Sequence, residues 1–175
     1  MQAAPPRPRV GISSCLLGEA VRYDGGHKRD ATLAGVVGPL VEWVPVCPEV
    51  EMGLGVPRPP MQLVQLGTTT HLITPSTGDD HTALMTSWST RRLDELAAAR
   101  LSGYVLKGRS PSCGLAAVPI FDASGEPAGA SRGLFAAALV TRFPHLPIAE
   151  ETTLADPDQR SDFLARVFAH HRAHS

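Results

Sequence analysis

Long apolar runs are missing from this sequence: none approaches the roughly 20 residues that a membrane-spanning helix needs. An excess of charge is missing too, because 16 basic and 17 acidic residues leave a formal net charge of −1. The chain therefore lacks the overall basic field that attracts nucleic acid, which leaves open only a local basic patch. The first nine residues are rich in Pro and Arg and contain no apolar segment, so they do not form a secretory signal. We expect a cytoplasmic protein that does not bind membranes.

Cysteine is also scarce, with three residues, Cys15, Cys47 and Cys113. An odd number of cysteines in a chain without an export signal argues against a disulfide framework. No two of them form a CxxC pair, so a local zinc knuckle is not expected. These three residues can act together only if the fold brings them together.

The chain is long enough for one domain with a substantial core. Its 175 residues and 43% hydrophobic content are typical of a globular domain that folds without disulfides. We expect a flexible segment at residues 1–9, followed by one domain over residues 10–175. The 16 glycines and 16 prolines predict many tight turns, which is where functional sites are commonly built.

Short β-prone runs alternate with helical patterns along the chain. This alternation predicts an α/β fold, with a mostly parallel, twisted sheet and helices on both faces in a Rossmann-like arrangement. The expected strands lie at 10–14, 43–46, 61–66, 71–74, 104–106 and 147–150, with an ambiguous short run at 118–121. The expected helices lie at 30–37, at 82–101, from a cap at Ser131 to 142, and after a cap at Asp156. The proline-rich stretch 53–60 predicts a rigid loop.

The cysteines share one position relative to the predicted sheet. Each follows a strand: Cys15 after 10–14, Cys47 after 43–46, and Cys113 in the loop after 104–106. Ligands of open α/β sheets bind outside the carboxyl ends of the strands, so three thiols at that edge can converge. Converging thiolates suit a catalytic zinc ion, or an iron–sulfur cluster in which one iron stays open as a Lewis acid. The alternative is that they are small buried hydrophobic residues.

The chain resembles the DUF523 family, which includes the thiouracil desulfurases, in three long segments. They are GISSCLLGEAVRYDGGHKRD (11–30), VPVCPEVEMGLGVPRPP (44–60) and LKGRSPSCG (106–114). The resemblance runs from about residue 10 to residue 151. It implies an α/β fold and an oxygen-sensitive [4Fe–4S] cluster held by Cys15, Cys47 and Cys113.

The same resemblance implies a reaction and a set of site residues. The open iron is expected to take the sulfur of a thiolated pyrimidine, similar to 2- or 4-thiouracil. Oxygen then replaces sulfur and hydrogen sulfide is released, without net electron transfer. Glu49 of the CPE motif and Ser110 of the SPSCG motif are expected to assist. Apart from what the resemblance implies, four further residues are expected to bind the substrate: Ser14, Tyr23, Asp24 and Ser112.

Each of these polar residues also has a simpler interpretation. Glu49 can cap a turn after Pro48, and the two serines around Pro111 can bond to local backbone. Tyr23 and Asp24 can form a turn with a surface pair before two glycines. Lys107 and Arg109 can offset the charge of an anionic cluster or simply be solvated.

Two other functions stay open at this stage: a cluster-bearing binding or sensor protein without turnover, and a metal-free cysteine enzyme. The sequence does not distinguish a free base from a nucleoside or a thiolated tRNA as substrate, and it does not indicate an oligomeric state.

Overall fold

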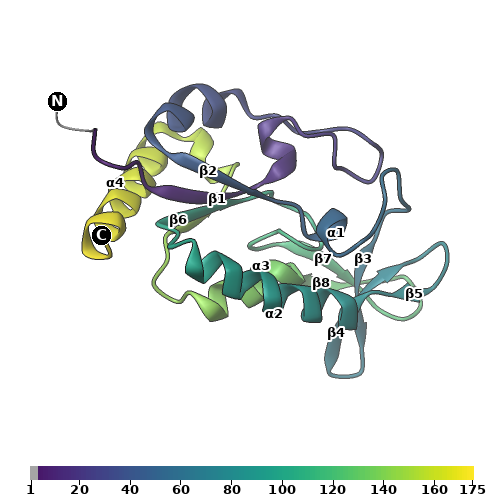
Figure 1. Ribbon diagram of the computed structural model, residues 1–175. Coiled ribbons are helices and arrows are strands. Elements are labelled where there is room, and N and C mark those ends of the chain that lie inside the picture. Colours follow the sequence, from purple (N-terminus) through teal and green to yellow (C-terminus); the bar gives the residue numbers. More distant parts are fainter. Residues whose placement is uncertain (1–3) are drawn as a thin grey trace.

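Four parallel strands form the central sheet of the computed structural model, which describes residues 4–175 (Figure 1). Their order is β2-β1-β6-β9, and every neighbouring pair is parallel. The strands are β1 (Arg9–Ser13), β2 (Glu42–Val46), β6 (Gly103–Leu106) and β9 (Ile148–Glu150). The predicted parallel α/β sheet is confirmed, with strand bounds within one residue of those expected. Residues 1–3 of the predicted flexible segment lie outside the described residues, and Arg9 already belongs to β1.

A second sheet, which the sequence did not predict as a separate layer, lies beside the first (Figure 1). In the described part of the chain its order is β5-β4-β3-β7-β8, and it mixes parallel and antiparallel pairs. The strands are β3 (Gln62–Leu66), β4 (Thr69–Thr74), β5 (Asp79–Asp80), β7 (Val118–Phe121) and β8 (Pro127–Ser131). The expected strands at 61–66 and 71–74 are β3 and β4, which pair as an antiparallel hairpin that turns at Gly67 with a φ of 63°.

The expected helices are present with changed ends. They are α2 (Thr82–Ala98), α3 (Leu134–Arg142) and α4 (Pro157–Ala173), and the expected helix at 30–37 contains a π-helical turn, η2 (Leu33–Val37). A further short helix, α1 (Pro48–Glu51), was not predicted. Asp156 caps α4 as predicted, because its Oδ1 accepts the N–H groups of Asp158 and Gln159 at 2.8 and 3.0 Å. The predicted cap at Ser131 is wrong, since Ser131 ends β8 and Gly133 is the cap of α3.

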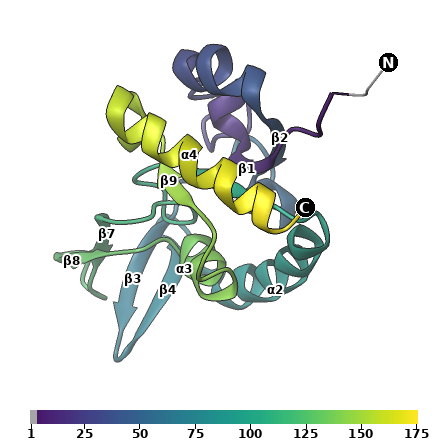
Figure 2. The ribbon, with the colours of Figure 1, turned by 90° about the vertical axis from the view of Figure 1, so that its left-hand side faces the viewer.

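The two faces of the parallel sheet bury different side chains. α4 covers one face (Figure 2), where its Phe163 and Val167 belong to one buried cluster with Val10, Ile12 and Val105 of the strands. The other face packs against α2 and α3, through Val46, Tyr104, Leu106, Trp88 and Phe135. Helices therefore cover both faces, as expected from the alternation of strands and helices.

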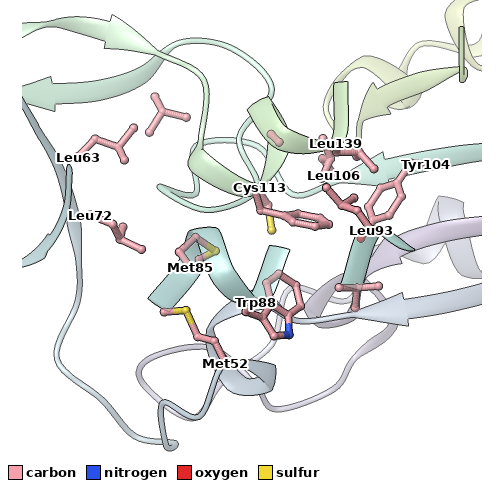
Figure 3. Close-up of a cluster of buried hydrophobic side chains, with 14 of the residues drawn as sticks. Met52, Leu63, Leu72, Met85, Trp88, Leu93, Tyr104, Leu106, Cys113 and Leu139 are labelled. Atoms are coloured by element: carbon pink, nitrogen blue, oxygen red, sulfur yellow. The ribbon is translucent and has the colours of Figure 1, made fainter. Parts of the chain in front are cut away.

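The core on the α2 side reaches one of the cysteines. Cys113 belongs to this cluster together with Met85, Trp88 and Leu106, all labelled in Figure 3. Trp88 and Tyr104 each contact Phe135, with ring centroids 5.3 and 6.0 Å apart. The loop that carries Cys113 is thus anchored in packed side chains. Within residues 4–175, no helix combines the length and apolar character that crossing a bilayer requires.

Candidate functional site

A cavity of about 340 Å³ opens at the carboxyl ends of β1, β2 and β6, and all three cysteines line it. β2 and β6 lie on opposite sides of β1. The chain therefore crosses from β1 to β2 in one direction, and the next parallel strand, β6, is added in the other direction. This reversal is where open α/β sheets bind ligands. The predicted convergence of the three thiols at one sheet edge is therefore present in the fold.

Cys15 and Cys47 are held in tight turns directly after their strands. Cys15 lies in a 3-10 turn, η1 (Ser14–Leu17), which ends at Gly18 with a φ of 95°. The carbonyl of Cys15 accepts the N–H groups of Gly18 and Lys28, at 3.2 and 2.9 Å. Cys47 is the N-cap residue of α1, and its N–H donates to Glu51 Oε2 at 2.8 Å. Both backbones are fixed by hydrogen bonds before any ligand is present.

Cys113 lies in a turn that Ser110 organises. Ser110 Oγ accepts the N–H groups of Ser112 and Cys113, at 3.2 and 3.1 Å. The carbonyl of Ser110 accepts the N–H of Gly114 at 2.8 Å. This is the local bonding role that a serine commonly has in a loop. It uses the acceptor capacity of the hydroxyl and leaves the Oγ–H as a donor at the cavity, which Ser110 also lines.

Two consecutive glutamates, Glu150 at the end of β9 and Glu151 directly after it, hold both ends of the Cys113 loop. Glu151 Oε1 lies 2.7 Å from Lys107 Nζ, and Glu151 Oε2 accepts the N–H of Gly108 at 2.7 Å. Glu150 Oε1 accepts the N–H groups of Leu115 and Ala116, at 2.8 and 3.0 Å. Sequence reasoning missed these contacts, although Glu150 ends a predicted strand at the same sheet edge as the cysteines and Glu151 follows it.

Glu49 is paired with an arginine that sequence reasoning also missed. Both residues line the cavity, and Arg58 Nη2 lies 3.2 Å from Glu49 Oε2. The Arg58 side chain is 6% exposed and that of Glu49 is 19% exposed. Arg58 belongs to the quoted segment 44–60, but nothing in its spacing indicates a partner nine residues earlier.

The cavity lining is strongly basic. Its acidic side chain, among the described residues, is Glu49, and its basic side chains are Arg22, Lys28, Arg58, Lys107 and Arg109. Arg109 is also held at a φ of 63°, a conformation that side chains other than glycine rarely adopt. A chain with almost no net charge thus concentrates positive charge where its three thiols meet.

The structure brings together some of the predicted residues and not others. The cavity is lined by the three cysteines with Ser14, Tyr23, Glu49 and Ser110. Asp24 and Ser112 are not among the lining residues. Asp24 closes a turn through a 2.9 Å bond from Gly26 N–H, which lowers the pKa of its carboxyl. Ser112 is fully buried, and its hydroxyl has no partner within residues 4–175.

The three thiols are poor nucleophiles as free groups. Burial raises the pKa of Cys15 to about 11, opposed by the nearby Lys107 ammonium. Burial also raises the pKa of Cys47, opposed by the Val50 amide, and that of Cys113. Reactive cysteines depend on a lowered pKa, and burial shifts the pKa of these three thiols the other way. A bound metal deprotonates such thiols outright.

Three cysteine thiols around one cavity are the type of donor that holds an iron–sulfur cluster. Within residues 4–175, no three side chains of His, Cys, Asp or Glu are placed to share one metal ion. A cluster offers its irons at separate corners, so its thiolate ligands lie further apart than those of one ion. Three soft sulfur donors around one cavity, with basic side chains beside them, match the ligands that iron–sulfur clusters prefer.

The chain is similar to known proteins in sequence and in fold. The sequence matches the 2-thiouracil desulfurase family model over residues 10–151. It is 32% identical over 109 residues to the uncharacterized protein YbbK of Bacillus subtilis (strain 168), covering 59% of this chain and 71% of YbbK. The fold is similar to that of TudS, a [4Fe-4S]-dependent thiouracil desulfidase, with a TM-score of 0.69 and 30% identity. That likeness covers 91% of this chain and 99% of the TudS chain.

Proposed function

The chain belongs to the 2-thiouracil desulfurase family, and we propose that it removes the sulfur of a thiolated pyrimidine such as 2- or 4-thiouracil. Water supplies the oxygen, so C=S and H₂O become C=O and hydrogen sulfide. The proposal rests above all on the convergence of three thiols, far apart in the sequence, in one cavity with a carboxylate. Residues 10–175 would form the catalytic domain.

Cys15, Cys47 and Cys113 would hold a [4Fe–4S] cluster at this cavity. When bound, such a cluster supplies an iron without a protein ligand, which acts as a Lewis acid toward the thiocarbonyl sulfur and needs no net electron transfer. The basic side chains of the cavity offset the negative charge of three thiolates, and Lys107 lies close enough to act on the charge of Cys15.

Glu49 is the general base. Its Oε2 is engaged by Arg58, so Oε1 is the oxygen that takes a proton from the attacking water and returns it to the departing sulfur. Pro48 fixes the offset between Glu49 and Cys47 at the start of α1. A carboxylate two residues from a thiolate ligand would thus be within reach of the substrate carbon that reacts.

The remaining polar residues bind and orient the pyrimidine. Ser110 has its acceptor positions occupied by backbone N–H groups and donates its hydroxyl proton to the substrate. Ser14 and Tyr23, which also line the cavity, contact the ring. Asp24 and Ser112 act indirectly: Asp24 shapes the turn beside Tyr23, and Ser112 packs behind Cys113.

Iron and sulfide analysis of protein purified without oxygen tests the cofactor. We expect about four iron and four sulfide ions per chain. The loaded protein is then incubated with 2- and 4-thiouracil, and uracil and released sulfide are measured. Metal-free protein that still desulfurates would point to a cysteine enzyme, and loaded protein without turnover would point to a sensor. Comparing free bases with nucleosides and thiolated tRNA defines the size of the substrate.

Replacing Glu49 by glutamine tests the base. The variant keeps the size of the side chain and cannot accept the proton, so turnover per bound iron should fall by about 10²–10⁴-fold while cluster loading stays unchanged. Glu19→Gln, at an exposed position, serves as the matched control. Wild-type turnover in Glu49→Gln would exclude Glu49 as the base.

A further inference from the structure

Arg58 connects the loop after η1 to Glu49 of α1 and to its own loop. Its Nη2 donates to Val21 O at 2.9 Å and to Glu49 Oε2 at 3.2 Å, and its Nη1 donates to Gly55 O at 3.2 Å. Its backbone N–H donates to Tyr23 O at 2.8 Å. One guanidinium therefore links the loop after η1, the loop after α1, and the carboxylate of α1.

The burial of Arg58 calls for an explanation beyond loop packing. Arginine is seldom buried unless its charge is paired, yet this side chain is 6% exposed. Its Nε is buried without a hydrogen-bond partner within residues 4–175, which is unfavourable for stability. The backbone bond to Tyr23 already joins the two loops. If this position served only to close the loop, an apolar side chain would give a more stable fold than a buried arginine.

We propose that Arg58 is a positioning residue for the reaction: it binds Oε2 of Glu49 and so holds the carboxylate with Oε1 free for proton transfer. This inference rests on the proposed function, with Glu49 as the base. A free glutamate samples several rotamers about three torsions, and this freedom is lost each time the base acts. Because Val21 O and Gly55 O anchor the guanidinium, Arg58 holds Glu49 relative to the cavity walls before substrate arrives.

The geometry requires arginine rather than a cation in general. The planar guanidinium presents several N–H donors in a rigid fork, so it can bind two carbonyls and a carboxylate together. A lysine ammonium at the same place keeps the charge but has neither the reach nor the directions for all three. Arg58→Lys should therefore lose part of the effect and Arg58→Gln more of it.

The test is a mutant cycle in protein purified without oxygen and loaded with iron. Arg58→Gln should lower kcat by about 10–10²-fold, the usual cost of a misplaced catalytic group, with KM and bound iron unchanged. The double variant Glu49→Gln/Arg58→Gln should be no slower than Glu49→Gln alone, because Arg58 acts through Glu49. Arg160→Gln is the matched control, since Arg160 donates to Leu154 O at 3.0 Å away from the cavity.

Two further measurements do not depend on the size of the rate change. Guanidinium ion added to Arg58→Ala should restore part of kcat and should leave Arg160→Ala unaffected. A crystal structure of Arg58→Gln should show the Glu49 side chain displaced or in several conformers. If Arg58→Gln or Arg58→Ala fails to fold, Arg58→Lys replaces it in the mutant cycle with Glu49→Gln.

Several results would overturn the inference. An unchanged kcat, or losses that multiply in the double variant, would mean that Arg58 does not act through Glu49. Loss of bound iron with normal turnover per remaining cluster would mean a structural role, and a rise in KM alone would mean a substrate contact. Wild-type protein that is loaded but releases no sulfide would refute the proposed function itself, which is a distinct outcome.

Discussion

Replacing Glu151 by glutamine removes one negative charge beneath the Cys113 loop and keeps the shape of the side chain. In the wild type, Glu151 Oε1 pairs with Lys107 Nζ at 2.7 Å, and the two side chains are 10% and 24% exposed. The amide of the variant still offers an oxygen to the N–H of Gly108, which Glu151 Oε2 accepts at 2.7 Å. The substitution therefore removes the charge and the acceptor that face Lys107, and it keeps the bond to Gly108.

The size of the effect follows from the partial exposure of Lys107. Removing one partner of a fully buried ion pair costs about 3–5 kcal/mol, whereas losing a hydrogen bond to a charged group costs about 1.5–3 kcal/mol. Lys107 is 24% exposed, so its ammonium can turn partly toward water and the lower range applies. For a chain of 175 residues this loss should lower Tm by about 3–12 °C.

Urea unfolding of the reduced, metal-free protein measures this loss without a contribution from a cofactor. The double variant Lys107→Met/Glu151→Gln should recover part of the stability, because it removes the ammonium that the single variant leaves unpaired. Glu126→Gln, at an exposed position, should stay within about 0.5 kcal/mol of wild type. A Glu151→Gln variant as stable as that control would refute the assigned role of the pair.

Three further predictions concern the cluster ligands, acid stability and the Cys113 loop. Serine in place of any one of the three cysteines should abolish cluster loading, and a variant with full iron content would show that its cysteine is not a ligand. Thr82, through its hydroxyl above all, lowers the pKa of Asp80 from 3.8 to about 2. The stability that the lowered pKa provides is complete above about pH 3.8 and is lost as the pH falls toward 2. Asp80→Asn should therefore flatten that part of the curve of unfolding free energy against pH, and an unchanged curve would contradict the prediction. A Cβ on Gly133 would lie 2.6 Å from the backbone of Ser112, so Gly133→Ala should destabilise the protein by about 1–3 kcal/mol in thermal unfolding and reduce bound iron, whereas Gly35→Ala, with open space around it, should match wild type.

The sequence determined the elements whose signals are local. Asp156 followed by Pro157 and Gln159 is a helix start that three neighbouring residues specify, and α4 begins there. The strands before Cys15 and Cys47 are likewise predicted by the β-prone residues within each strand. Because strands of a parallel α/β sheet present their carboxyl ends at one edge, the shared position of the cysteines already predicted that they meet.

The tertiary structure decided which side chains surround the cysteines. Glu151 reaches Gly108 across 43 residues, and Glu150 reaches Leu115 across 35, so no local pattern encodes the clamp. The same applies to Ser131: its residue type suits a helix cap, but pairing with Val118 of β7 places it in a strand. Long-range pairing overrides local preference at such positions.

The division is sharpest between Glu49 and Arg58. The sequence singled out Glu49 by its place beside Cys47, a relation between neighbours. Arg58 lies nine residues further on, after a loop of glycines and prolines whose path is fixed by bonds to Val21 and Gly55. That path depends on a contact with the loop that follows β1 and η1. The pairing of the buried Arg58 guanidinium with the Glu49 carboxylate is therefore seen only in the folded chain.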